Sequence, residues 1–163
     1  MSEVKKIVTK KGDRMAFVQL EDMSTQVEGV VFPRDYERLQ QYLEKDARLI
    51  VWGKAEQRDD TPQLIVNDAE PVEQAQMLVV DLTPEQAIDP NARRRLQGLL
   101  QSQGGEDRYA LKAPVLGAIR NNGQHQLVRF GHKYWVKDGR AAIAALNSNG
   151  FPARVVPILS NAS

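Results

Sequence analysis

Apolar and polar residues alternate along the first part of the chain in a way that predicts short strands. Residues 4–9 are rich in β-branched side chains, and a glycine-containing turn at 10–13 leads into a second segment at 14–21. The period of two places three apolar residues of this second segment on one face, the candidate core face: Ala16, Val18 and Leu20. The pattern therefore predicts a β-hairpin with one buried face.

A change of period after this hairpin predicts one helix between strands. A third strand at 26–32 stops at Pro33, and apolar residues then recur at helical spacing at Tyr36, Leu39 and Leu43. Strands return at 48–55 and 63–67, joined by a polar turn at 59–62. Five strands with a helix between the third and the fourth are the element order of an OB-fold, a small Greek-key barrel whose groove binds oligonucleotides.

The second half of the chain predicts a mixture of helices and strands. A strand at 77–82 precedes a helix capped by Asp89, and Asn121-Asn122-Gly123 is a hairpin turn between two antiparallel strands. A short strand is expected at 133–136, followed by a helix capped by Asp138.

These patterns divide the chain into two domains, separated by a connector at 68–76 that is rich in Glu, Gln and Pro. We expect a β barrel of the OB-fold type over residues 1–75 and a small α+β domain over residues 76–163.

Composition excludes several classes of protein. The chain has no cysteine, which excludes disulfides, thiolate nucleophiles and cysteine-based zinc sites, and its 42% hydrophobic content is enough for a core. No window approaches the roughly eighteen consecutive apolar residues that a membrane span needs, and the N-terminus lacks the apolar run of a signal peptide. We expect no membrane association and a cytoplasmic location.

The net charge of +1 hides an asymmetry between the halves. Residues 1–75 hold 11 Lys and Arg against 15 Asp and Glu, a net charge of −4, whereas residues 76–163 hold 11 against 6, a net charge of +5. Phosphate neutralisation supplies most of the non-specific affinity for nucleic acid, so a protein that wraps it is normally basic throughout. Any strand binding in the first half must therefore be local and weak.

The first hairpin is a basic finger in this acidic half, and it is the clearest candidate for a nucleic-acid site. Five cations lie within ten residues: Lys5, Lys6, Lys10, Lys11 and Arg14. In an OB-fold this loop is one of two that flank the oligonucleotide groove, the other being the turn at 59–62. Phe17 is a candidate stacking platform, and Trp52 with Lys54 is a weaker one; stacking is worth about 1–3 kcal/mol per base and tolerates any sequence.

A structural explanation competes with this hypothesis. Lysines at hairpin tips also prevent edge strands from sticking to one another. Phe17 and Trp52 are also explained as packing residues, and Asp59 and Asp60 make the second loop acidic, which argues against a phosphate contact there.

No catalytic, metal or cofactor site is expected in this chain. Phosphoryl transfer needs clustered carboxylates that hold metal ions or a glycine-rich phosphate cradle, and no Walker sequence is present. The acids fall in turns and on helix faces, as solvated charges do. His125 and His132, the only histidines, lack further ligands at useful spacing.

The hairpin and the third strand also carry a family resemblance. Residues 4–22, VKKIVTKKGDRMAFVQLED, resemble the OB domain of bacterial DNA polymerase III alpha subunits almost residue for residue. The match continues through residues 27–33, VEGVVFP, and Tyr36. In that family the OB domain is implied to contact the single-stranded template.

The second half is similar, more loosely, to the C-terminal domain of the same subunit. Its marks are the leucines at 96, 99 and 100 before a glycine pair, then VRFG at 128–131 and YWV at 134–136. The resemblance implies docking of a replisome partner, the tau subunit of the clamp loader. The family's catalytic palm lies far upstream and has no counterpart here, so the chain is part of a DNA-directed DNA polymerase only if the resemblance holds.

One departure from the family bears on the fold. Family OB domains have several more residues of the first strand before the position of Val4, and in the barrel these pair with the fourth strand. We therefore expect a C-terminal fragment or a truncated reading frame whose barrel is not fully closed, with an unpaired edge along residues 48–55.

The sequence thus favours a binding module without chemistry of its own, in which the OB domain contacts single-stranded DNA and the second domain docks a replisome protein. Two alternatives stay open. The chain can be a protein–protein scaffold whose lysines serve solubility, or it can form an active polymerase together with the rest of the subunit.

Overall fold

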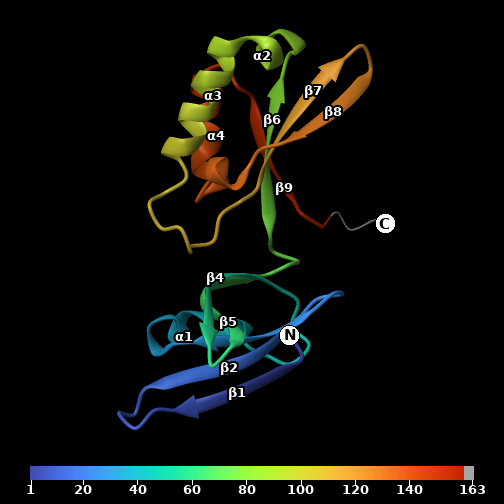
Figure 1. The fold of residues 1–163 in the computed structure, drawn as a ribbon. Helices are drawn as coiled ribbons and strands as arrows, with labels where there is room; N and C mark the ends of the chain where they lie inside the picture. The colour runs from blue at the N-terminus through green and yellow to red at the C-terminus, as the bar shows by residue number, and fades with distance from the viewer. Residues whose placement is uncertain (160–163) are drawn as a thin grey trace. The chain divides into compact units, whose positions relative to one another are not determined.

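The structure, a computed structural model, describes residues 1–159 and divides into two compact units (Figure 1). Unit 1 comprises Met1–Gln74 and a short returning segment, Tyr109–Leu111. Unit 2 comprises Ala75–Arg108 and the chain from Lys112 onward. No helix within residues 1–159 is long and apolar enough to cross a membrane.

Unit 1 is a five-stranded sheet with one helix. Its elements are β1 (Glu3–Val8), β2 (Arg14–Glu21), β3 (Gln26–Val31), α1 (Pro33–Leu39) with a 3-10 turn at Gln40–Tyr42, β4 (Leu49–Arg58) and β5 (Thr61–Pro71). The strand order is β1-β2-β3-β5-β4, and all neighbours are antiparallel except β3 and β5. The predicted element order is confirmed.

The sheet of unit 1 is open. Strands β1 and β4 are its two edges, and they form no ladder with each other in the described residues. Met1 bonds to the segment that precedes β4. Its ammonium donates to the Ala47 carbonyl at 3.0 Å, and its carbonyl accepts from the Asp46 N–H at 2.9 Å. The prediction of an unpaired β4 edge is confirmed, and the term β barrel is corrected to an open OB-type sheet.

Helix α1 begins where the sequence predicts, with Pro33 in its first turn. Proline has no backbone N–H, and in the first turn of a helix an N–H would have no intrahelical acceptor, so no hydrogen bond is lost. Tyr36 and Leu39 are buried, and Leu39 is fully enclosed against β-strand residues such as Ala16 and Val31. This packing holds the helix against the inner face of the sheet.

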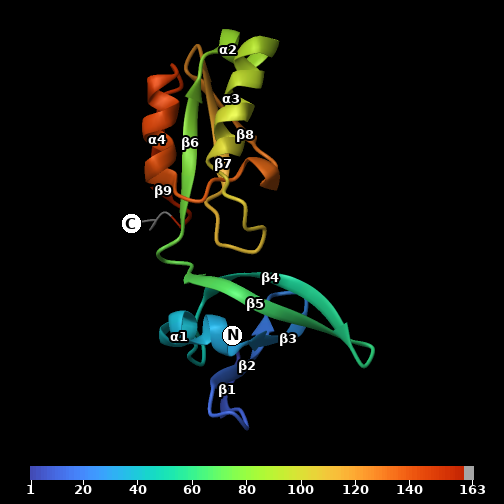
Figure 2. The same cartoon turned by 90° about the vertical axis from the view of Figure 1, so that its left-hand side faces the viewer.

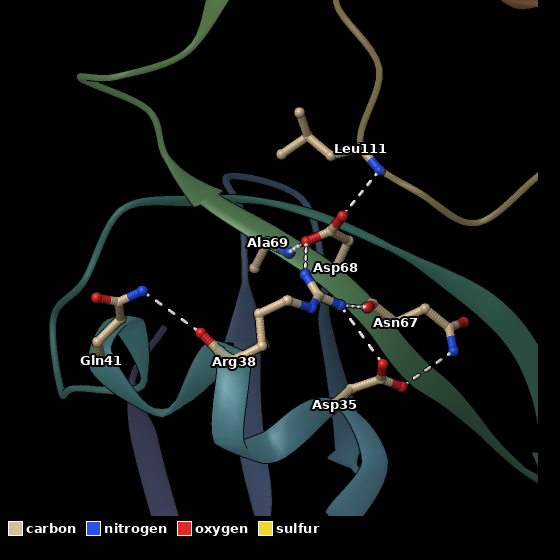
Figure 3. Close-up of polar contacts among 7 residues, drawn as sticks. All are labelled: Asp35, Arg38, Gln41, Asn67, Asp68, Ala69 and Leu111. Carbon is tan, nitrogen blue, oxygen red and sulfur yellow. Dashed lines mark hydrogen bonds and ion pairs between the residues drawn. The ribbon is translucent and has the colours of Figure 1, made fainter. Parts of the chain in front are cut away.

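A polar network ties the same helix to β5 (Figure 3). The Arg38 guanidinium donates to the Asn67 carbonyl at 2.6 Å, is ion-paired with Asp68, and lies 3.4 Å from an Asp35 carboxylate oxygen. Asp68 also accepts from the backbone N–H of Leu111 at 3.1 Å, which attaches the returning segment to unit 1. The network therefore joins three separate stretches of the chain.

Unit 2 is a four-stranded mixed sheet with helices on one face (Figures 1 and 2). Its elements are β6 (Gln76–Leu82), α2 (Pro84–Ile88), α3 (Pro90–Ser102), β7 (Val115–Asn121), β8 (Gln124–Arg129), a 3-10 turn at His132–Tyr134, α4 (Gly139–Ser148) and β9 (Ala153–Pro157). The strand order is β8-β7-β6-β9, with β6 and β7 parallel. Side chains from β6, β7, α3 and α4 form the core of this unit around Phe151.

Several local predictions for the second half are confirmed and others are wrong. Asp89 and Asp138 cap α3 and α4 by accepting backbone N–H bonds. The predicted strand at 133–136 is wrong: the chain forms a 3-10 turn there, and Val136 alone makes an isolated bridge to Ala113. The connector predicted at 68–76 is shorter, since β5 runs to Pro71 and β6 begins at Gln76.

Candidate nucleic-acid interface

The turn of the first hairpin, which we call the basic tip, presents its two lysines outward. The Gly12 N–H donates to the Thr9 carbonyl at 2.9 Å, and the Thr9 N–H donates to the Asp13 carbonyl at 2.8 Å. Gly12 has φ +88°, a left-handed conformation that glycine adopts without strain. Lys10 and Lys11 lie at the corner of this turn and are exposed.

Strand register places one residue of each strand of unit 1 in a single row across the sheet. Lys5 pairs with Phe17, Phe17 with Val30, Val30 with Ile65, and Ile65 with Lys54. Directly paired residues project from the same face of a sheet. We call this set the central row; it places two lysines at the ends of an apolar strip.

The central row lies on the outward face. The core residues of β2, Ala16 and Val18, alternate with Phe17 and therefore point the other way, toward α1. Phe17 is half-buried, while Val30 beside it is only 1% exposed. In OB-folds the face of strands 2 and 3 is the one that binds oligonucleotides. Phe17 therefore keeps part of its surface accessible to solvent on this face.

The seven candidate residues fall into three groups: the central row, the basic tip and the inner face of the sheet. Lys5, Phe17 and Lys54 share the central row, and Lys10 and Lys11 form the basic tip. Lys6 pairs with Ala16 and Arg14 pairs with Val8, so both project from the inner face. The sequence interpretation grouped all five hairpin cations, but the pleat separates Lys6 and Arg14 from the central row.

The hairpin cations differ from Lys54 in their ion pairing within the described residues. Within residues 1–159 none of the five hairpin cations, Lys5, Lys6, Lys10, Lys11 and Arg14, forms an ion pair. Lys54 Nζ lies 2.7 Å from Glu56 Oε1, and this hydrogen bond raises the pKa of Lys54. A phosphate at Lys54 must therefore compete with a carboxylate, whereas one at the hairpin does not.

A second row limits where a polyanion can lie. The neighbouring rung of the outward face, which we call the acidic row, consists of Glu3, Gln19, Glu28, Gln63 and Glu56. Beyond it the β4–β5 turn carries Asp59 and Asp60, both with positive φ. In the opposite direction the outward face continues over Ile7 and Met15 to the basic tip. The charges therefore favour a strand between the central row and the tip.

Sequence reasoning missed Val30, Ile65 and the acidic row. Their positions relative to Phe17 depend on pairing between strands that are distant in sequence, for which the alternation within one strand gives no register. The described residues also contain no group of His, Asp and Glu side chains arranged to hold a metal ion.

Comparison with known proteins identifies unit 1. Residues 2–72 match the model of the tRNA anti-codon family, described as an OB-fold nucleic acid binding domain. Residues 2–72 form an OB-fold domain. This OB-fold region is similar to DNA polymerase III subunit alpha of Staphylococcus epidermidis (strain ATCC 12228 / FDA PCI 1200), at 40% identity over 70 residues, or 43% of this chain and 7% of that protein.

Two further relatives of the OB-fold region carry the same name. DNA polymerase III subunit alpha of Bacillus subtilis (strain 168) is 41% identical over 73 residues, covering 45% of this chain and 6% of the relative. DNA polymerase III subunit alpha of Staphylococcus aureus (strain Mu50 / ATCC 700699) is 39% identical over 66 residues, covering 40% of this chain and 6% of the relative. The chain thus spans less than a tenth of the length of these relatives.

Proposed function

We propose that the OB-fold domain binds single-stranded DNA weakly and without sequence preference. The observation that carries this proposal is the central row, in which Lys5 lies beside Phe17 on the outward face of the sheet and Lys54 lies at the far end of the row, beyond Val30 and Ile65. An aromatic ring beside a cation provides a base platform with an adjacent phosphate contact, as in single-strand binding grooves.

The proposed path of the strand follows from the charges. It crosses Phe17 and runs toward the basic tip, where Lys10 and Lys11 meet phosphates, and it avoids the acidic row. Three contacts, at Lys5, Lys10 and Lys11, correspond to a slope of about −2 in a plot of log affinity against log salt, because each phosphate contact on a single strand contributes about −0.7. A site with three phosphate contacts binds a single strand weakly by itself and adds affinity when a second DNA-binding site holds the same strand.

The names of the relatives suggest the protein assembly in which the chain acts. We propose that the chain is a non-catalytic part of a replicative DNA polymerase III alpha subunit and acts in cytoplasmic DNA replication. In this role the OB-fold domain holds the template strand near the polymerising site of the remaining subunit.

Titration of a labelled oligo-dT at two salt concentrations tests the DNA site. Binding is expected at low salt, with loss on raising the salt and on changing Lys10, Lys11 and Arg14 together to Glu. A matched control changes Lys45, Arg93 and Arg94 to Glu, which removes the same charge elsewhere and is expected to retain binding. Absence of binding at low salt favours the scaffold alternative, and equal loss in both triple variants means that only net charge matters.

We further propose that unit 2, a small α+β domain, docks a replisome protein such as the tau subunit of the clamp loader. Helices α3 and α4 cover one face of its sheet, and no other element of this unit within the described residues covers the opposite face (Figure 2). That opposite face presents Leu127, which is 64% exposed, beside Ala118 and Asp81 in one row. Changing Leu127 to Asp is expected to abolish capture of purified tau without lowering the affinity for oligo-dT.

A further inference from the structure

Phe32, between β3 and α1, is an exposed aromatic residue that the core of unit 1 does not use. It is 45% exposed, whereas its neighbour Val31 is fully buried. All four phenylalanines of the chain lie within residues 1–159, and Phe32 is the only exposed one among them. Its side chain is outside the core cluster of the unit, and in the described part of the chain it contacts no other aromatic ring and no cation. The fold therefore leaves this ring available at the surface.

The position of Phe32 in the chain is one where a polar residue is normally preferred. Phe32 is the N-cap of α1, and its side chain forms no capping hydrogen bond. Ser, Thr, Asp and Asn are favoured at this position because their side chains accept a bond from a backbone N–H of the first turn. A residue that departs from a local preference and stays exposed indicates a use other than folding.

The Phe32 ring lies on the outward face of the sheet. The backbone of this residue is extended, with φ −71° and ψ 160°, so the side-chain alternation of β3 continues through it. Val30 belongs to the central row and Val31 packs in the core, so Phe32 projects from the same face as Val30. The ladder of β2 with β3 ends where Ala16 faces Val31, which puts Phe32 in line with Met15. The ring therefore lies between the central row and the basic tip.

The spacing between the two outward rings suits an unpaired strand. Because Phe17 pairs with Val30, Phe17 and Phe32 are diagonal neighbours, one strand apart and two residues along. Such neighbours lie about 7–8 Å apart, within reach of aromatic side chains. This is roughly twice the 3.4 Å that separates successive bases along one strand of a duplex. Two successive bases on these rings are therefore unstacked from each other, as only a single strand allows.

We propose that Phe32 is a second base platform of the DNA site, so that two neighbouring bases of a single strand stack on Phe17 and Phe32. The inference rests on the proposed function of the OB-fold domain and deepens it by one binding residue. The strand then crosses the central row at Phe17, passes over Phe32, and brings its next phosphates to Lys10 and Lys11 of the basic tip. Stacking on each ring adds affinity that is independent of the base sequence.

Three protein variants test the role of the ring by anisotropy of a labelled oligo-dT on the full chain at low salt. Phe32→Leu keeps an apolar side chain without a ring and is expected to weaken binding about fivefold to tenfold. Phe32→Tyr keeps the ring and is expected to bind as the unchanged protein does. Val8→Ala is the matched control, because Val8 is 66% exposed in the same hairpin but pairs with Arg14 on the inner face. This control is expected to retain full affinity.

An abasic scan of the DNA provides a second measurement that leaves the protein unchanged. Each member of a set of short labelled oligo-dT strands lacks one base but keeps every phosphate. Two adjacent positions are expected to be sensitive to loss of the base, one for each ring. In Phe32→Leu one of these two positions is expected to lose its sensitivity, because the base there no longer has a ring to stack on.

The outcomes separate this inference from the proposed function. If Phe32→Leu binds as tightly as the unchanged protein while Phe17→Leu binds more weakly, the DNA site stands and Phe32 is not part of it. Equal losses in Phe32→Leu and Phe32→Tyr also overturn the inference, since the ring is then not what binds. A single sensitive position in the scan, or two that persist in Phe32→Leu, has the same consequence. If oligo-dT does not bind at low salt at all, the proposed function fails and the inference fails with it.

Discussion

The sharpest test of the proposed DNA site compares two adjacent lysines of β1. Lys5 pairs with Phe17 and projects from the outward face, whereas Lys6 pairs with buried Ala16 and projects from the inner face. Both side chains are exposed, and neither forms an ion pair within residues 1–159. Changing either lysine to Gln removes the same charge, so the net charge is the same in both variants and only the face differs.

The expected magnitude follows from counterion release. A lost phosphate contact on a single strand removes about 0.7 from the salt slope, which corresponds to about a fivefold loss of affinity at about 0.1 M salt. Lys5→Gln is therefore expected to weaken binding about fivefold and to flatten the slope from about −2 to about −1.3. Lys6→Gln is expected to change neither by a measurable amount.

Anisotropy of a labelled oligo-dT, measured over a series of salt concentrations, gives affinity and slope together. Thermal unfolding of both variants checks that the hairpin remains intact. If Lys6→Gln weakens binding as much as Lys5→Gln, the outward face is not the site and the proposal fails.

Three further predictions concern binding and stability. Phe17→Leu is expected to weaken oligo-dT binding by about 1 kcal/mol, which is the low end of the range for one stacked base because the ring is half-buried. The slope of log affinity against log salt is expected to stay unchanged, and a changed slope would contradict stacking. Gly53→Ala places a Cβ 2.1 Å from the Ile65 carbonyl oxygen, so denaturant unfolding is expected to show a loss near the upper end of about 1–3 kcal/mol. Gly98→Ala, with open space around it, is the matched control and is expected not to destabilise. Burial raises the pKa of Glu70 above its ordinary value of 4.5, so its ionised form costs stability at neutral pH. Glu70→Gln is therefore expected to raise the melting temperature at pH 7, and the gain should shrink as the pH falls through the folded-state pKa and vanish below 4.5, where both states are protonated.

Local sequence chemistry predicted those elements whose signals lie within a few residues. The turn around Gly12, the proline that starts α1 and the aspartate caps of α3 and α4 each depend on one conformational preference or one side-chain bond. Helix α2 was missed although it carries such a signal. Its N-cap Thr83 and Gln86 form a capping box, in which each side chain bonds the other residue's backbone N–H.

Features set by contacts between distant residues could not be predicted in this way. Strand β5 extends beyond its β-branched run to Pro71 because β4 pairs with it along its whole length. The register shift between Trp52 and Gly53 decides which face Lys54 occupies, and nothing in the local pattern indicates it. The candidate site was therefore predicted as a set of residue types, while its arrangement into rows depended on the folded sheet.

The exposed edge of the second sheet has a consequence for the behaviour of the chain in solution. All six residues of β8 are exposed, and Arg129 is the only lysine or arginine among them. Edge strands that carry few charges pair readily with strands of other molecules. At high concentration and without a partner the chain is therefore expected to self-associate through β8, and Leu127→Lys is expected to keep it monomeric in sedimentation experiments.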